Sequence, residues 1–123
     1  QSGISKGFYN HNDFMDLTSW KVSHFAKHNI NILDVFHCPH SPKSYCSCRK
    51  PKPGMLIEAR NKHNINMAQS WMIGDKETDS DAAISAGISK TILVRSGHRI
   101  DENISKAKFI LDSIKDTKLI ITS

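Results

Sequence analysis

The chain has 123 residues and a formal net charge of +5, and 38% of its residues are hydrophobic and 24% charged. This length suits one domain, and this composition excludes a disordered tail and a collagen-like fibre. No apolar stretch approaches the ~18 residues of a membrane span, and residues 1–7 lack a signal peptide's apolar run, so we expect a soluble cytoplasmic protein that binds no membrane.

Helices and strands are predicted to alternate along the chain. Asn10 or Asn12 can cap a first helix that runs to about Lys27, and its apolar side comprises Phe14, Leu17, Val22, Phe25 and Ala26. The later elements are a strand at 32–36, a loop to Pro53, a helix from 55 to about 61, a strand at 71–73, a helix at 79–86 and strands at 91–94 and 109–111. This order predicts an α/β fold with a parallel sheet and crossover helices.

One pentapeptide, Lys-His-Asn-Ile-Asn, occurs at 27–31 and again at 62–66. A spacing of 35 residues is also found in helical repeat arrays, but nothing else in the sequence repeats. Both copies follow a predicted helix, and Asn tolerates the left-handed conformation just past a helix end. We therefore interpret the pentapeptide as a signal that ends a helix.

The excess positive charge is concentrated in one stretch. Between Asp34 and Glu58 there is no acidic residue, and the basic residues there are Lys43, Arg49, Lys50 and Lys52. No row of aromatic residues accompanies them, which argues against single-stranded nucleic acid as the partner. The pattern indicates a local site for an anion.

The three cysteines of the chain lie in one loop, as Cys38-Pro39-His40 and Cys46-Ser47-Cys48. An odd number so closely spaced makes a poor disulfide framework and suits a reducing compartment. Three thiolates and one imidazole form a closed tetrahedral zinc set, which leaves no open position and so favours a structural role. The alternative is a loop with ordinary cysteines and a surface histidine.

Arg49 and Lys50 follow the last of these cysteines, on a segment stiffened by proline. Arginine offers a planar fork for phosphate oxygens and lysine a point charge, so the pair suits a phosphorylated ligand. A solvated basic turn is the alternative interpretation.

Asp75 and Asp79 follow the predicted strand at 71–73. Asp75 is expected at the carboxyl end of a parallel strand, where open α/β sheets bind ligands. Two carboxylates four residues apart, on a loop that enters a helix, can bind Mg²⁺ directly or through water. The alternative is a helix start with acids in its first turn, a role that Asp81 fits better.

Together these motifs resemble the haloacid dehalogenase (HAD) superfamily of aspartate-nucleophile phosphatases. The resemblance covers residues 1 to about 115 in order, through the segments 1–9, 38–40, 46–55, 74–79 and 92–97. It implies a Rossmann-like fold in which residues 1–123 are the C-terminal part of a single domain, incomplete at its N-terminus, with a zinc loop at 38–50.

The resemblance also implies roles for individual residues. Lys50 would neutralise the nucleophile and the transferred phosphoryl group, Asp75 would bind Mg²⁺, and Asp79 would be a supporting acid. The implied substrate contacts are Gln1, Ser2, Arg49 and Lys76. The implied structural zinc ligands are Cys38, His40, Cys46 and Cys48. The Asp-x-Asp strand of the family, with its nucleophile and its acid/base, is missing, so we expect a fragment that is inactive alone.

Within the superfamily, the likeness is to the heptose-bisphosphate phosphatases of lipopolysaccharide precursor synthesis. It implies hydrolysis of a sugar phosphate monoester through an aspartyl-phosphate, with a small phosphorylated sugar as the partner, no nucleic acid and a monomeric intact enzyme. The five-residue gap between His40 and Cys46 resembles the histidinol-phosphatase branch instead, whereas residues 52–55 and 94–98 favour the heptose branch. A histidinol-phosphate phosphatase and a non-catalytic zinc-stabilised binding module remain the alternatives.

Overall fold

The computed structural model describes residues 2–41 and 43–121. The chain divides into two compact units, Gln1–Cys46 and Ser47–Ser123. No helix in the described ranges is long and apolar enough to cross a bilayer.

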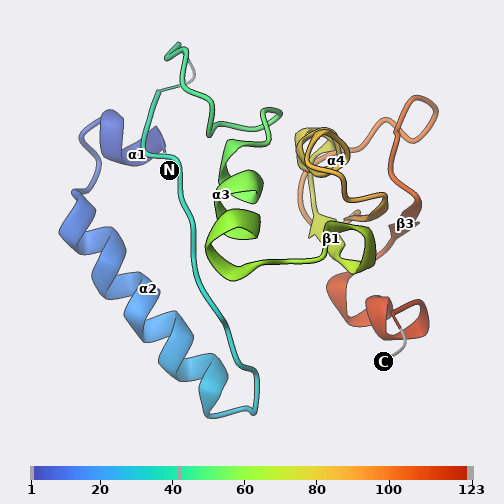
Figure 1. The fold of residues 1–123 in the computed structure, drawn as a ribbon, viewed down its shortest axis with the longest axis horizontal. Helices are drawn as coiled ribbons and strands as arrows, with labels where there is room; N and C mark the ends of the chain where they lie inside the picture. Colours follow the sequence, from blue (N-terminus) through green and yellow to red (C-terminus); the bar gives the residue numbers. More distant parts are fainter. Residues whose placement is uncertain (1, 42, 122–123) are drawn as a thin grey trace. The chain divides into compact units, whose positions relative to one another are not determined.

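The first unit contains two helices, α1 (Ser2–Ser5) and α2 (His11–Ala26), the long blue helix in Figure 1. The Asn10 side chain accepts a hydrogen bond from the Asp13 backbone N–H (2.8 Å), and the Asp13 carboxylate accepts one from the Asn10 N–H (3.0 Å). This reciprocal cap satisfies two donors that a helix start otherwise leaves unpaired. Of the two predicted caps, Asn10 and Asn12, the structure uses Asn10.

The predicted buried side of α2 is mostly wrong. Only Phe14 is buried, and its ring lies 4.2 Å from the His37 ring between centroids. Leu17 is 50% exposed and Phe25 is 39% exposed, while Ala26 is exposed and Val22 is partly exposed. A helix buries an apolar side only where another element covers it. The described residues of the first unit include no strand, so no sheet of that unit covers this side.

The predicted strand at Ile32–Phe36 is not a sheet strand. Exposure alternates along it, with residues 32, 34 and 36 partly buried and residues 31, 33 and 35 exposed. This period of two is the pattern of an extended chain. A strand also needs a hydrogen-bonded neighbour, and no described residue pairs with this segment in a ladder. The local conformation was predictable, whereas the pairing was not.

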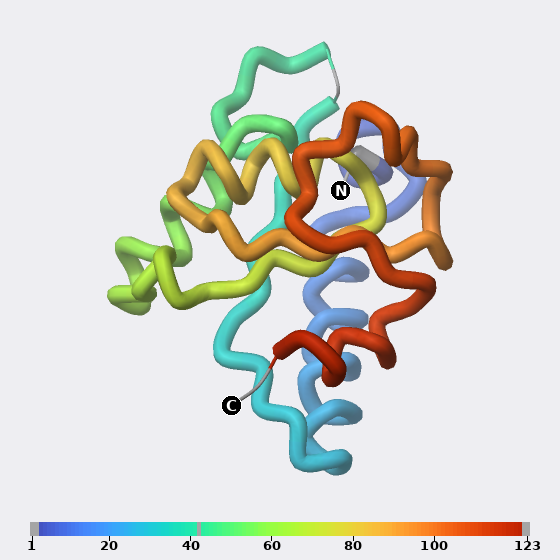
Figure 2. Tube along the Cα trace, turned by 90° about the vertical axis from the view of Figure 1, so that its right-hand side faces the viewer, coloured from blue at the N-terminus to red at the C-terminus, as the bar shows by residue number. Residues whose placement is uncertain are grey.

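The second unit is built around a parallel sheet of the order β1-β2-β3. Its strands are β1 (Trp71–Gly74), β2 (Lys90–Val94) and β3 (Phe109–Leu111), and Ile92 of β2 pairs with Ile73 on one side and Phe109 on the other. The helices are α3 (Gly54–His63) and α4 (Glu77–Ser85), with short 3-10 helices η1 (Met67–Gln69) and η2 (Ile114–Leu119), the red turn near the C-terminus in Figure 2. The predicted parallel α/β fold is confirmed.

The core of this unit lies between the sheet and α4, which contacts both β1 and β2. Ile92 and Leu93 of the central strand are fully buried, as are Ala82 and Ala83 of the helix. A central parallel strand is covered on both faces, which explains its continuous apolar run. Small alanines let the helix approach the sheet closely and so fix the loop between β1 and α4.

The repeated pentapeptide Lys-His-Asn-Ile-Asn lies at the end of a helix at both of its positions. Asn29 follows α2 with φ of 60°, and Asn64 follows α3 with φ of 53°. Both values lie in the left-handed region, which asparagine tolerates better than most residues. The prediction of a helix-end signal is confirmed.

Candidate functional site

Two loops meet at the carboxyl edge of the sheet in the second unit. Asp75 follows β1 directly, and Gly97 and His98 follow β2. Because the two strands are parallel neighbours, their carboxyl ends share one edge. The His98 Nδ1 lies 2.6 Å from Asp75 Oδ2, and a Cβ added to Gly97 would lie 2.2 Å from the same oxygen. The second loop therefore lies directly against the Asp75 carboxylate.

The Asp75 side chain has the chemistry of a ligand for a hard cation. It is 38% exposed, and the His98 ring contacts its Oδ2 rather than its Oδ1. The hydrogen bond from His98 is the main cause that lowers the pKa of Asp75, and desolvation opposes it. An ionised, partly exposed carboxylate fits Mg²⁺, which keeps several waters and takes one or two carboxylates from a protein.

Asp79 is placed differently, because both of its oxygens are used within the protein. Its side chain is 6% exposed, and Oδ2 accepts hydrogen bonds from the backbone N–H groups of Asp75 (3.0 Å) and Lys76 (3.1 Å). Oδ1 forms an ion pair with Lys50 Nζ. A Cβ on Gly74 would lie 2.3 Å from Oδ2, so glycine allows this close approach. Asp79 thus holds the loop that carries Asp75.

Lys50 reaches this edge from a tight turn at residues 47–54. The Gly54 N–H donates to the Ser47 carbonyl (3.0 Å), and a Cβ on Gly54 would lie 2.2 Å from that carbonyl oxygen. The Lys50–Pro51 peptide bond in the turn is cis. The ion pair with Asp79 joins this turn to the first turn of α4, so the structure brings Lys50, Asp75 and Asp79 together.

The remaining predicted substrate contacts are partly described. Arg49 is half-buried next to Lys50, and Lys76 is exposed next to Asp75. Neither side chain forms a hydrogen bond or ion pair with the described part of the chain, so both cations can meet an anion. Ser2 begins α1, but its side chain and all of Gln1 lie outside the described residues.

The four predicted zinc ligands form a cluster in their loop. Cys38 Sγ lies 3.6 Å from Cys46 Sγ and 3.4 Å from His40 Nδ1, and with Cys48 all four ligand atoms lie within 4.8 Å of one another. Tetrahedral zinc, with bonds of about 2.3 Å to sulfur and about 2.0 Å to nitrogen, separates two sulfurs by about 3.8 Å and a sulfur and a nitrogen by about 3.5 Å. The donor types and separations therefore fit a metal ion.

The sequence matches a known protein family. A family model described as HAD-hydrolase-like matches residues 47–117, which is more than half of the chain. The chain belongs to the HAD-hydrolase-like family. The resemblance stated from its motifs is confirmed.

Curated relatives of this HAD-hydrolase-like chain are named as heptose-1,7-bisphosphate 7-phosphatases, of either the beta or the alpha anomer. D-glycero-beta-D-manno-heptose-1,7-bisphosphate 7-phosphatase of Vibrio cholerae is 43% identical over 94% of this chain and 67% of its own length. The enzyme of the same name from Pasteurella multocida is 38% identical over 98% of this chain and 70% of its own length. The chain spans about two thirds of the length of the curated relatives that it matches.

A solved structure agrees with the fold. The crystal structure of D,D-heptose 1.7-bisphosphate phosphatase from B. bronchiseptica, complexed with magnesium and phosphate, matches with a TM-score of 0.72 and 29% identity. The match covers 77% of this chain and 52% of that chain. The similarity therefore extends to a protein whose fold binds magnesium and phosphate.

Three groups of this HAD-hydrolase-like chain make contacts that the sequence did not predict. One is the Gly97–His98 pair described above. Another is Glu77, which accepts hydrogen bonds from Ser105 Oγ (2.6 Å) and the Lys106 N–H (2.8 Å) and so ties the loop after β2 to α4. The third is Arg95, which pairs with Glu102 and Asp112. Their partners lie 7 to 29 residues away, and no local pattern signals such contacts.

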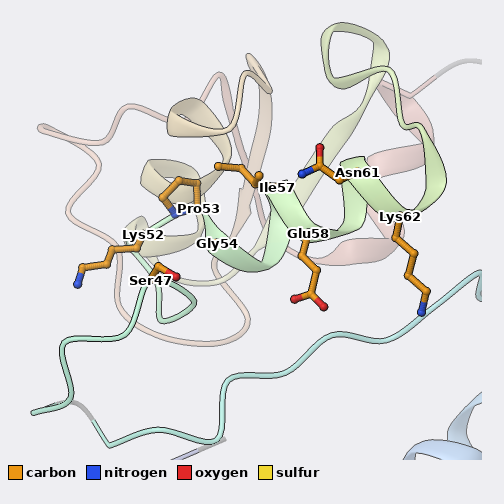
Figure 3. A pocket seen from close by; sticks show the side chains of 8 residues that line it. All are labelled: Ser47, Lys52, Pro53, Gly54, Ile57, Glu58, Asn61 and Lys62. Atoms are coloured by element: carbon orange, nitrogen blue, oxygen red, sulfur yellow. The ribbon is translucent and has the colours of Figure 1, made fainter.

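A separate pocket of about 780 Å³ lies along α3. Figure 3 shows its lining, with Glu58 and Lys62 on one side of the helix and Pro53 and Gly54 at its start. None of the predicted site residues lines it. The candidate site is therefore the carboxyl edge of the sheet rather than this hollow.

Proposed function

We propose that this chain is part of a Mg²⁺-dependent phosphatase that removes the 7-phosphate of D-glycero-D-manno-heptose 1,7-bisphosphate. The observation that carries the proposal is the joint placement of Asp75, Asp79 and Lys50 at one sheet edge. The Asp75 carboxylate lies there with the Lys50 ammonium, which Asp79 holds in place, and Arg49 and Lys76 supply further positive charge. Binding of a phosphate ester together with a divalent cation requires this combination of charges. The substrate is taken from the enzyme names of the relatives.

Each residue at this edge has a proposed part in the reaction. Asp75 holds Mg²⁺, which when bound polarises the phosphoryl oxygens and offsets their charge. The Lys50 ammonium stabilises the negative charge that these oxygens gain in the transition state, and Asp79 keeps the ammonium in place. Arg49 and Lys76 bind the substrate as cations that no described carboxylate neutralises.

Gln1 and Ser2 are proposed to bind the substrate phosphate, as the family resemblance implies. The reaction also needs a nucleophile that accepts the phosphoryl group. The sequence has one Asp-x-Asp arrangement, Asp79-Ser80-Asp81, but it lies inside α4 rather than at the end of a strand. Asp79 is also engaged with Lys50. We therefore assign the nucleophile to none of the residues 1–123 and expect no turnover by this chain alone.

The cysteine loop is proposed to hold one structural zinc ion. The support is the donor set of Cys38, His40, Cys46 and Cys48 and the separations of Cys38 from Cys46 and from His40, which match tetrahedral zinc. A site with four protein ligands has no position for substrate or water, so zinc there orders the loop that leads into Arg49 and Lys50. Three reduced thiols also suit a cytoplasmic location, and a monomer is the proposed state.

The test is a comparison of substrates with a full-length protein that carries this sequence. Mg²⁺-dependent phosphate release from heptose 1,7-bisphosphate is measured beside release from histidinol phosphate, with the 123-residue chain as a second sample. Preference for the heptose ester supports the proposal. Preference for histidinol phosphate, which the five-residue gap between His40 and Cys46 would favour, replaces the substrate. Release from neither ester contradicts the proposed activity, and steeply salt-dependent nucleic-acid binding would then favour a binding module.

A further inference from the structure

His98 is the side chain that contacts the Asp75 carboxylate from the neighbouring strand's loop. Its Nδ1 lies 2.6 Å from Oδ2, and the two residues are separated by 23 positions in the sequence. An ionised carboxylate can only accept a hydrogen bond, so the Nδ1 must carry the proton and donate it. The ring is 61% exposed.

Gly97 makes this contact possible by leaving space. An added Cβ would lie 2.2 Å from Asp75 Oδ2 and 2.6 Å from Asp75 Cβ, distances that real Cβ atoms do not adopt. The backbone of the loop after β2 therefore passes against Asp75, and the next side chain along, His98, can reach Oδ2. Two adjacent residues of one loop are thus fitted to one carboxylate of another.

We propose that His98 is a positioning residue for the metal ligand Asp75, and that Gly97 permits this role. The hydrogen bond occupies Oδ2 and restricts the rotation of the carboxylate, which leaves Oδ1 as the oxygen for the cation. Partners that orient a ligating carboxylate commonly change metal affinity, because the ligand otherwise loses conformational freedom on binding. This inference rests on the proposed function, since it takes Asp75 as the Mg²⁺ ligand.

A purely structural role for His98 predicts something different. A side chain that is 61% exposed covers little apolar surface, so its removal should hardly change the free energy of unfolding. A positioning role instead predicts weaker Mg²⁺ binding with an unchanged unfolding midpoint. Asparagine distinguishes the two roles further, because its Nδ2 stands two bonds from Cβ, as the histidine Nδ1 does, and can donate to the same oxygen.

The experiment titrates MgCl₂ into the full-length protein and its variants and measures the dissociation constant by calorimetry. We expect His98→Ala to weaken Mg²⁺ binding about 10-fold. His98→Asn should restore most of that loss, and Gly97→Ala should weaken binding as His98→Ala does. His28→Ala makes the same chemical change in the turn after α2 and should leave Mg²⁺ binding unaltered.

Activity provides a second readout. In the full-length phosphatase, His98→Ala should raise the Mg²⁺ concentration needed for half-maximal turnover about 10-fold and leave kcat at saturating Mg²⁺ nearly unchanged. Equal Mg²⁺ affinity in wild type and His98→Ala overturns the inference while the proposed function stands. Equal loss in His98→Ala and His98→Asn also overturns it, because the donor would then be irrelevant. Failure of the wild-type protein to bind Mg²⁺ contradicts the proposed function and this inference together.

Discussion

Lys50 and Asp79 form an ion pair that joins the turn after the cysteine loop to the first turn of α4. The lysine side chain is 40% exposed, whereas the carboxylate is 6% exposed and also accepts two backbone hydrogen bonds. The pair therefore couples two parts of the site that are 29 residues apart in sequence. Its loss should affect both stability and the proposed chemistry, and the two effects can be separated.

Lys50→Ala is predicted to lower the free energy of unfolding by about 1 kcal/mol. The substitution removes the cation that pairs with the buried Asp79 carboxylate, which keeps its two backbone N–H donors. The loss is modest because the lysine side chain is partly exposed, and such an ion pair is weaker than a fully buried one. Phosphate release by the full-length protein should fall at least about 100-fold, since one charge is removed from the transition state. Urea unfolding and a phosphate assay measure the two effects.

A matched control for this prediction is Lys6→Ala, which removes an exposed lysine of the first unit. It should change neither quantity. Equal activity in Lys50→Ala and wild type would contradict the role assigned to Lys50. A loss of activity that Lys6→Ala reproduces would point to overall charge instead.

Ser80→Ala is predicted to stabilise the protein. The Ser80 hydroxyl is fully buried in α4, and its Oγ has no hydrogen-bond partner in the described residues. A buried hydroxyl without a partner costs about 1 kcal/mol or more, and alanine also has the higher helix propensity. We expect the thermal midpoint to rise by about 4 °C.

Ser85→Ala controls for helix propensity, because Ser85 is exposed in the same helix. It should raise the midpoint by less than Ser80→Ala does. A lower midpoint for Ser80→Ala would mean that the hydroxyl has a partner, such as an ordered water, that contributes to stability.

The sheet could be predicted from sequence because its signals are local. An apolar run at residues 91–94 marks β2, Gly74 is the last residue of β1, and Gly87 lies just after α4. At Ile32–Phe36 the same kind of run gave an extended chain without a sheet partner. Pairing depends on residues distant in sequence, so a single apolar run cannot establish it.

The candidate site also has one part that could be predicted from the sequence and one part that could not. Asp75 and Asp79 are four residues apart, so a strand followed by a helix places them in one loop. The contacts of Lys50 with Asp79 and of His98 with Asp75 join loops 29 and 23 residues apart. Only the folded sheet brings these pairs together, and the family resemblance indicated a role for Lys50 but none for His98.

The Glu102 carboxyl is predicted to show a lowered pKa that depends on Arg95. The guanidinium donates to both carboxylate oxygens, at 2.7 and 3.3 Å, and this hydrogen bonding is the main cause that lowers the pKa. A folded-state pKa below the unfolded one adds stability that is complete above the unfolded pKa and is lost as the pH falls through the lowered value. The pair should therefore weaken only in acid.

NMR titration of the Glu102 side-chain carbonyl measures this pKa directly. Arg95→Ala should raise it towards the usual value of about 4.3. Arg99→Ala removes an equal charge from the same loop, and Arg99 is not among the groups that shift the pKa of Glu102, so this variant should leave that pKa nearly unchanged. An equal rise in both variants would show that net charge, rather than the hydrogen bond, sets the pKa.

Reduced protein purified with ZnCl₂ is predicted to retain about one zinc ion per chain, measured by elemental analysis. The closed set of Cys38, His40, Cys46 and Cys48 supports this stoichiometry, because each residue offers one ligand atom. Removal of zinc by a strong chelator should disorder residues 38–50, since the cross-links that the metal makes between the four ligands are lost. The backbone amide NMR signals of residues 38–50 measure this loss of order.

Cys46→Ser should lose zinc and the order of the loop together, because a hydroxyl replaces a thiolate ligand. Ser44→Ala, in the same loop and without a ligand atom in the cluster, should retain zinc. In the full-length phosphatase, Cys46→Ser should also lower activity, because the loop leads directly into Arg49 and Lys50. Reduced, folded wild-type protein without zinc would contradict the four-ligand site. Loss of activity in Cys46→Ser with zinc still bound would contradict its structural role.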